Sequence, residues 1–237
     1  MTPTTINSAV ADLSERLHRE GGTTSAIIHD ALRAAIITGE LAPGQAISEV
    51  EISKRFAISR QPVREAFILL GQEKLIEVRP NRGTFIRKIS VREVLDACFV
   101  REVIELAIVR EVTKTRSAAL IKKLRKNIAS QKKVKTGDSR TFLELDEELH
   151  YLLAQNAKRD FAWEVTEKVK SQLNRVRFLT YDHATPIATL VAEHEAIVDA
   201  IEAGDADLAE KNMLHHMSEI YRSLPIMAEK YPGIFID

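Results

Sequence analysis

The chain contains one cysteine, Cys98, among its 237 residues, so it cannot form an intrachain disulfide. A nearly cysteine-free sequence is typical of a reducing compartment, and we expect a cytoplasmic protein. No apolar run approaches the roughly 20 residues that a membrane-spanning helix needs. The first residues, MTPTTINSAV, lack the basic-then-apolar order of a signal peptide. These absences predict a protein that is neither exported nor inserted in a membrane.

Glycine and proline are also scarce, with nine and seven residues, which favours helix over loop-rich folds. Hydrophobic residues make up 45% of the chain and charged residues 29%, so there is enough apolar material for a globular core. The length suits one large domain or two of ordinary size. We therefore expect a mainly helical, globular protein.

The chain has no net charge, because 34 Lys and Arg residues balance 34 Asp and Glu residues. That average conceals a basic segment. Residues 52–90 contain nine basic residues and only three acidic ones, a local excess of six positive charges. The basic residues are Lys54, Arg55, Arg60, Arg64, Lys74, Arg79, Arg82, Arg87 and Lys88. Such a cluster is the usual footprint of nucleic-acid binding.

The segment containing this cluster has the element order of a winged helix-turn-helix. Residues 1–22 are predicted to be an extension, with a short amphipathic helix through Val10, Leu13 and Leu17. Apolar spacing predicts three further helices, from about 24 to 38, after Ser48, and from Ser59 to about Gly71. Two β-type runs, 75–78 and 84–86, then flank the basic tip RPNRG and predict a hairpin.

In a winged helix-turn-helix the third helix enters the major groove and the wing contacts the backbone or the minor groove. On the third helix Arg60 and Arg64 lie one turn apart, away from an apolar face formed by Val63, Ala66, Leu69 and Leu70. The alternative is a solvated arginine face. The capping residue Ser59, the short helix before it and the basic wing together favour DNA binding over that alternative. The predicted DNA-binding residues are Arg55, Ser59, Arg60, Gln61, Arg64, Asn81, Arg82 and Gly83.

The rest of the chain, residues 90–237, is predicted to be an all-α bundle, with the domain boundary at Ser90. Helices are expected at about 90–114, 117–134, 138–156, 160–181, 185–203 and 205–230. Their expected N-terminal caps are Ser117, Asp138, Thr185 and Asp205. Pro225 is expected to kink the last helix. The domain plan is thus an extension (1–22), a winged domain (23–89) and a helical domain (90–237).

Four side chains that can bind metals lie on apolar stripes of the predicted bundle. Asp146 and His150 are four residues apart on one helix face, and His194 and His216 each fall among apolar residues at helical spacing. A divalent cation would satisfy all four groups, and three imidazoles with one carboxylate suit zinc, nickel, manganese or iron. The other interpretation is that His194 and His216 are core histidines and Asp146–His150 an ion pair. Spacing by itself favours that second interpretation.

The run LAPGQAISEVEISKRFAISRQPVREAFILLGQEKLIEVRPNRGTFI resembles the DNA-binding domain of GntR-type bacterial transcription regulators, most diagnostically in SRQPVREAF and EVRPNRGTF. The following part resembles the FadR branch, with its FCD-type, effector-binding helical domain. In metal-binding members of that branch, one Asp and three His stand in the contexts DxxxH, EHxAIxxAI and MxxH. The resemblance therefore implies that Asp146, His150, His194 and His216 bind a metal.

Arg101 lies on an apolar stripe with Cys98 and Ile104, an unusual place for a cation. It can form an i,i+4 ion pair with Glu105. The resemblance implies instead that this position faces a ligand, and a guanidinium–carboxylate contact would explain an inward arginine. Arg177 is a second candidate for the same effector.

Together these features predict a dimeric transcription regulator, with a repressor favoured over an activator, and not an enzyme. Its partners would be double-stranded DNA with an imperfect palindrome, a second copy of the chain and a small organic acid. One rival is a regulator that senses the metal itself. Another is a metal-dependent hydrolase with an incidental DNA-binding domain, although no motif supplies a general base.

Overall fold

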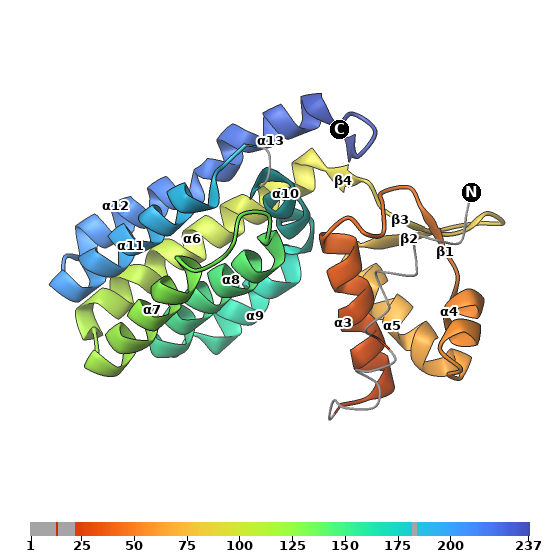
Figure 1. Cartoon of the computed structure of the whole chain (residues 1–237), viewed down its shortest axis with the longest axis horizontal. Helices are drawn as coiled ribbons and strands as arrows, with labels where there is room; N and C mark the ends of the chain where they lie inside the picture. The colour runs from red at the N-terminus through yellow and green to blue at the C-terminus, as the bar shows by residue number, and fades with distance from the viewer. Residues whose placement is uncertain (1–12, 14–21, 182–183) are drawn as a thin grey trace. The chain divides into compact units, whose positions relative to one another are not determined.

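The computed structural model describes residue 13, residues 22–181 and residues 184–237, and the chain is mainly helical. The helix predicted within residues 1–22 lies almost wholly outside the described residues. The chain divides into two compact units (Figure 1). One consists of residues 1–90 with the C-terminal residues 231–237, and the other of residues 91–230. In the described part of the chain, no helix is both long and apolar enough to cross a membrane.

The first unit contains the helices α3 (Thr24–Ile37), α4 (Glu49–Arg55) and α5 (Arg60–Gln72). A three-stranded antiparallel sheet follows the order β1 (Ala46–Ile47), β3 (Gly83–Ile86) and β2 (Ile76–Arg79). Strands β2 and β3 form the predicted hairpin, in which Arg79 pairs with Gly83. The helices and hairpin enclose one apolar core that includes Ile28, Leu32, Ile52 and Leu70. This is a winged helix-turn-helix.

Helix α5 differs in one respect from the predicted pattern. Its buried residues are Val63, Ala66, Phe67 and Leu70, whereas Leu69 is 40% exposed. The prediction that Leu69 belongs to the apolar face was wrong. Phe67 lies on that face instead, because positions 63, 66, 67 and 70 follow the i, i+3, i+4, i+7 spacing of one helix face.

A small parallel sheet joins β4 (Ile89–Ser90) to the C-terminal strand β5 (Phe235–Ile236), a pairing that the sequence did not predict. The Ser90 hydroxyl also donates to the Asp237 carboxylate, 3.1 Å away. The last seven residues therefore return to the segment that precedes the helical unit.

The second unit is a bundle of α-helices, with no strand among its described residues. The helices are α6 (Val91–Thr115), α7 (Ala118–Gln131), α8 (Ser139–Asn156), α9 (Asp160–Val169), α10 (Ser171–Tyr181), α11 (Ile187–Ala203), α12 (Ala206–Met217) and α13 (Glu219–Lys230). The long helix α6 contacts most of the others. Its buried residues Ile108, Val109 and Val112 pack in the main core of this unit.

Three expectations about the bundle were wrong. The helix expected at 160–181 is broken at Lys170, and the helix expected at 205–230 is broken at Ser218. Pro225 lies inside the last helix, α13, as expected of its position. Thr185 does not cap α11, because Pro186 occupies the N-cap position and the Thr185 hydroxyl donates to Glu219.

Candidate metal centre and DNA-binding surface

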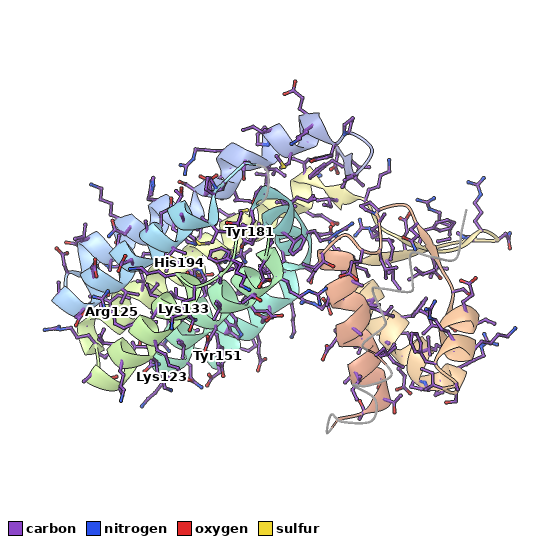
Figure 2. The ribbon with its side chains drawn as sticks, viewed as in Figure 1. Lys123, Arg125, Lys133, Tyr151, Tyr181 and His194 are labelled. Atoms are coloured by element: carbon purple, nitrogen blue, oxygen red, sulfur yellow. The ribbon has the colours of Figure 1, made fainter. Side chains whose placement is uncertain are left out.

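Four side chains from three helices converge inside the bundle. They are Asp146 and His150 of α8, His194 of α11 and His216 of α12. All four are buried, and one ligand atom from each lies within 4.8 Å of the others. The Nε2 atom of His194 lies 3.2 Å from Nε2 of His216 and 3.4 Å from Oδ1 of Asp146. Figure 2 shows the labelled His194 among the helices of the bundle. The structure thus brings together the four residues singled out in the sequence.

The Nδ1 atom of each imidazole contacts an oxygen atom of a side chain on another helix. The contacts are His194 Nδ1 to Gln131 Oε1 at 2.8 Å, His216 Nδ1 to Glu193 Oε2 at 3.0 Å, and His150 Nδ1 to Glu105 Oε2. An amide oxygen or a carboxylate at Nδ1 requires the proton there, which leaves the lone pair on Nε2. Metal-binding histidines are usually oriented by such a second contact. All three lone pairs are therefore presented to the same centre.

The short distance between two Nε2 atoms then poses an electrostatic problem. Burial lowers the pKa of His194 well below its usual range, and burial together with the nearby His150 lowers the pKa of His216 to about 3. Both rings are consequently neutral, and their Nε2 atoms lie 3.2 Å apart, so that either a shared proton or a cation must separate the two nitrogens. In addition, His150 Nε2 and Asp146 Oδ1 are buried without a hydrogen-bond partner among the described residues. A cation at the centre would satisfy all of these atoms, so the donor set fits a divalent metal.

Two buried arginines adjoin the centre. Arg177 forms an ion pair with the Asp146 carboxylate through Oδ2 and also reaches Glu147. Burial would raise the pKa of Asp146, but Arg177 and His150 hold that pKa well below its usual range, so the carboxylate is ionised. Arg101 donates from Nε to Glu105 at 2.5 Å, which is the i,i+4 pair considered from the sequence. Both arginines thus have carboxylate partners beside the cluster.

A small cavity of about 40 Å³ lies next to the cluster. Its lining includes Arg101, Arg177, Asp146 and His216, so both predicted effector residues reach it. Tyr181 lines it as well, and its buried hydroxyl has no hydrogen-bond partner in the part of the chain that the structure describes. Burial raises the pKa of this hydroxyl, which therefore keeps its proton. The cavity offers two cations and one phenol donor.

Several residues of this centre were not predicted as site residues. They are Glu105, Gln131, Tyr181 and Glu193. Glu193 stands beside His194 in the sequence, and Glu105 was noted only as the partner of Arg101. Gln131 meets His194 across 63 positions, so no local pattern indicates it. His215, the sequence neighbour of His216, is exposed and offers no ligand atom to this group.

The predicted DNA-binding residues all lie on the surface of the first unit. Helix α5 begins at Arg60, directly after its N-cap Ser59, although the Ser59 side chain accepts no capping hydrogen bond. Arg60 is only loosely associated with Glu49, at 3.9 Å, and Gln61 donates to Glu65. The exposed residues are Arg55, Ser59, Arg60, Gln61, Arg64, Asn81, Arg82 and Gly83.

The wing has an exposed basic tip, and side-chain contacts lie below it. Asn81 and Gly83 have positive φ angles of 58° and 103°, which turn the chain between β2 and β3. Below the tip, Arg79 donates to Glu77 and stacks over the Phe85 ring at 4.5 Å. Arg82 is an exposed cation of the turn itself.

Comparisons with known proteins agree with both halves of this description. Residues 24–86 match the family model described as bacterial regulatory proteins, gntR family, and residues 96–219 match the FCD domain. The chain is 37% identical over 198 residues to the HTH-type transcriptional repressor RspR of Escherichia coli, covering 83% of this chain and 87% of that protein. It is 28% identical to a probable D-xylose utilization operon transcriptional repressor of Paenarthrobacter nicotinovorans, covering 93% and 95%.

Solved structures show the same fold at low identity. Escherichia coli McbR/YncC superposes with a TM-score of 0.74 at 15% identity, over 89% of this chain and all of that one. A putative GntR transcriptional regulator from Rhodococcus sp. RHA1 superposes with a TM-score of 0.70 at 23% identity, over 85% and 97%.

Proposed function

The chain belongs to the GntR family of bacterial regulatory proteins and carries an FCD domain, and from this premise we propose a transcription repressor controlled by a small carboxylate. The carboxylate would bind beside a metal held by Asp146, His150, His194 and His216. The observation that carries the metal part is the convergence of four buried ligand atoms within 4.8 Å of one another, among them the Nε2 atoms of His194 and His216. Zinc, nickel, manganese and iron all accept this donor set.

The DNA-binding half of the proposal rests on exposure and charge. Arg60 and Arg64 project from the start of α5, and Arg82 from the wing. An arginine on a guanine edge contributes about 1–3 kcal/mol of discrimination, and an arginine on a phosphate contributes sequence-independent affinity. A twofold dimer would read an imperfect palindrome, because each copy contributes one reading head.

The effector half rests on the cations that line the small cavity. Arg101 and Arg177 would exchange part of their contact with Glu105 and Asp146 for the carboxylate of the effector, and Tyr181 would donate its unpartnered hydroxyl. The bound metal supplies a Lewis-acidic positive centre that an anionic oxygen can approach. Effector binding would then change the preferred arrangement of the reading heads. Couplings of about 1–3 kcal/mol are typical, which corresponds to a 5- to 150-fold change in operator affinity.

The test uses the full chain loaded with zinc. An operator duplex is first selected from a random-sequence pool, and its Kd is then measured by fluorescence anisotropy. A panel of mono-, di- and hydroxycarboxylates of two to six carbons is added at saturation, which calorimetry establishes separately. We expect at least one acid to change the Kd more than fivefold. A Kd that stays constant with a calorimetrically bound acid would refute effector control.

The same measurement tests the rival function, in which the regulator senses the metal itself. If chelation by itself abolishes operator binding and no acid changes it, the metal is the signal. The hydrolase interpretation requires ester or amide turnover that His194→Ala removes while operator binding persists. Because the family and the relatives named above are transcription regulators, we expect no such turnover.

A further inference from the structure

The cavity beside the metal cluster is too small for an organic effector. Its volume of about 40 Å³ admits little more than one or two waters, or one carboxylate head. Small-molecule sites usually have volumes of about 300–1,000 Å³. The body of any effector that places its acid group here must therefore lie elsewhere.

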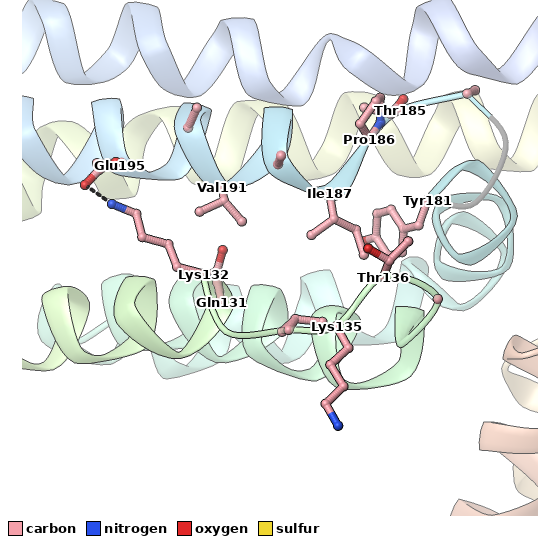
Figure 3. Close-up of a pocket in the computed structure, with 15 residues that line it drawn as sticks. Gln131, Lys132, Lys135, Thr136, Tyr181, Thr185, Pro186, Ile187, Val191 and Glu195 are labelled. Atoms are coloured by element: carbon pink, nitrogen blue, oxygen red, sulfur yellow. Dashed lines mark hydrogen bonds and ion pairs between the residues drawn. The ribbon is translucent and has the colours of Figure 1, made fainter.

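A second cavity of about 690 Å³ adjoins the first on the outer side. It lies between residues 131–137, which connect α7 to α8, and the first turns of α11 (Figure 3). Val134, Ile187 and Val191 give it apolar walls. We call it the outer cavity, and the one beside the metal cluster the inner cavity.

The charged residues of the outer cavity do not offer a second acid site. Lys132 and Glu195 pair with each other at 2.6 Å at one end. Lys135 points away from the cavity in Figure 3. The cavity thus presents mainly aliphatic surface, with the neutral side chains of Thr136 and Thr185 at its edge. An apolar occupant would fit these walls better than a sugar or a second anion.

The two cavities share a wall. Tyr181 and Thr185 line both of them. The Tyr181 ring packs edge-on against Phe142, with ring centroids 5.0 Å apart, and its hydroxyl lies close enough to Arg177 and Asp146 for their charges to act on its pKa. In the outer cavity, Gln131 also contacts the metal-cluster residue His194. The two spaces are therefore separated by one layer of side chains.

We propose that the two cavities form one divided site for an organic acid with an apolar chain. The carboxylate occupies the inner cavity, beside Arg101 and Arg177. The chain passes between Tyr181 and Thr185 and lies against Ile187 and Val191 in the outer cavity. This rests on the proposed function, since it assumes a carboxylate effector, and it adds the class of molecule: an aliphatic monocarboxylate longer than the inner cavity can hold.

The test measures binding of straight-chain carboxylates, from acetate to octanoate, to the zinc-loaded full chain by calorimetry. Each buried CH₂ contributes about 0.8 kcal/mol, which is about a fourfold change in Kd at full burial. We expect the Kd to fall about two- to fourfold per carbon beyond butanoate. A Kd that is independent of chain length, or no binding by any member of the series, would overturn the proposal.

Variants separate the two cavities. Ala188 and Ala192 are exposed on the side of α11 that lines the outer cavity, so a phenylalanine at either position fills the space without entering the core. We expect Ala192→Phe to weaken octanoate binding at least tenfold and to leave acetate within twofold. Thr189→Phe, an exposed neighbour outside the cavity lining, is the matched control and should change neither. Equal effects of Ala192→Phe on both acids would overturn the divided site.

Tyr181→Phe tests the shared wall, because it removes only the hydroxyl. All acids should bind roughly fivefold more weakly, with the dependence on chain length unchanged. These measurements contain no DNA. A normal chain-length dependence without operator control would therefore refute the proposed function and keep the divided site, whereas operator control without chain-length dependence would refute the divided site only.

Discussion

At the scale of single residues, the acceptors behind the imidazoles govern the centre as much as the ligands do. A histidine whose Nδ1 proton has no acceptor can rotate or change tautomer, and its Nε2 lone pair is then lost to the metal. Gln131, Glu105 and Glu193 prevent this for the three rings. Each comes from a different segment, so each can be altered separately.

Glu193 gives the clearest prediction. Its carboxylate accepts from His216 Nδ1 at 3.0 Å and does not itself face the centre. Glu193→Ala should lower zinc affinity about 10- to 100-fold, as usual for the loss of an outer partner. Competition with a chromophoric chelator measures this. His215→Ala is the control, because exposed His215 also contacts Glu193 but offers no ligand atom to the cluster. An affinity within twofold of the parent in Glu193→Ala would contradict the orienting role.

A second residue-scale prediction concerns pH and the winged unit. His29 of α3 contacts Glu73, which also accepts from Arg33 at 2.7 Å. Burial acts to lower the pKa of His29, but contacts with Asp30 and Glu73 prevail and raise it from 6.5 to about 9. Because the folded value is the higher one, this contribution is complete below pH 6.5 and is lost as the pH rises through 9.

We therefore expect the winged unit to lose roughly 1 kcal/mol of unfolding free energy between pH 6.5 and 9, a figure reduced for solvent screening. Urea unfolding of the full chain, followed by hydrogen exchange of α3 and α5 amides, measures it. In His29→Gln this pH dependence should flatten. A parent protein whose α3 protection is constant across the range would show that the contact is not coupled to folding.

At the scale of elements, we propose that α5 and the wing make different kinds of contact with DNA. Arg64 is exposed on the N-terminal half of α5, which we expect to meet bases, while Arg82 occupies the wing turn. Arg64→Ala should weaken binding to the selected operator by about 1–3 kcal/mol and relax its base preference. Arg82→Ala should weaken all duplexes and reduce the slope of log K against log salt by about 0.9.

Lys123→Ala is the matched control for these charge removals. Lys123 is also exposed and basic, but it lies on α7 of the helical unit, in the run KKLRKN, which we interpret as a solvated face. Its removal should leave both the Kd and the salt slope unchanged. A salt slope that falls as much for Lys123→Ala as for Arg82→Ala would contradict the assignment of the DNA contact to the winged unit.

How far the elements could be predicted depended on whether local chemistry marks their ends. The capping side chains of Ser48, Ser117, Asp138 and Asp205 accept backbone N–H groups as expected, and Gly204 ends α11 with a φ of 78°. The breaks at Lys170 and Ser218 carry no glycine or proline, so apolar periodicity runs through them unmarked. Strands of two residues, such as β1 and β5, are too short to show alternation.

For the candidate site, the burial of single residues could be predicted from the sequence, but their convergence could not. Spacing on a helix places Asp146 and His150 on one inward face, and the apolar stripes around His194 and His216 do the same, so burial followed from local pattern. Their convergence at one point depends on how α8, α11 and α12 pack. For the same reason, Gln131 and Tyr181 could not be found, since each meets the centre from a distant stretch of chain.

At the scale of the whole molecule, two separate apolar cores underlie the two units. The first contains Leu32 and Leu70 among its buried residues, and the main core of the second contains Val112 and Leu149. The four residues of the candidate metal centre lie entirely in the second unit. Anything that binds the cluster in the folded state therefore stabilises one unit directly and not the other.

Calorimetry of the full chain tests this arrangement. Zinc at 100 times its Kd should add about 2.7 kcal/mol to the unfolding free energy of the helical unit. For a unit of this size that raises its Tm by roughly 8–10 °C, while the transition of the winged unit, identified by the His29→Gln variant, stays in place. His216→Ala should remove the shift, because the cluster then lacks one of its three imidazoles. A single transition that moves as a whole with zinc would mean that the two cores unfold together, and effector signals could then pass from the cluster to α5 through shared stability rather than through a rearrangement of independent units.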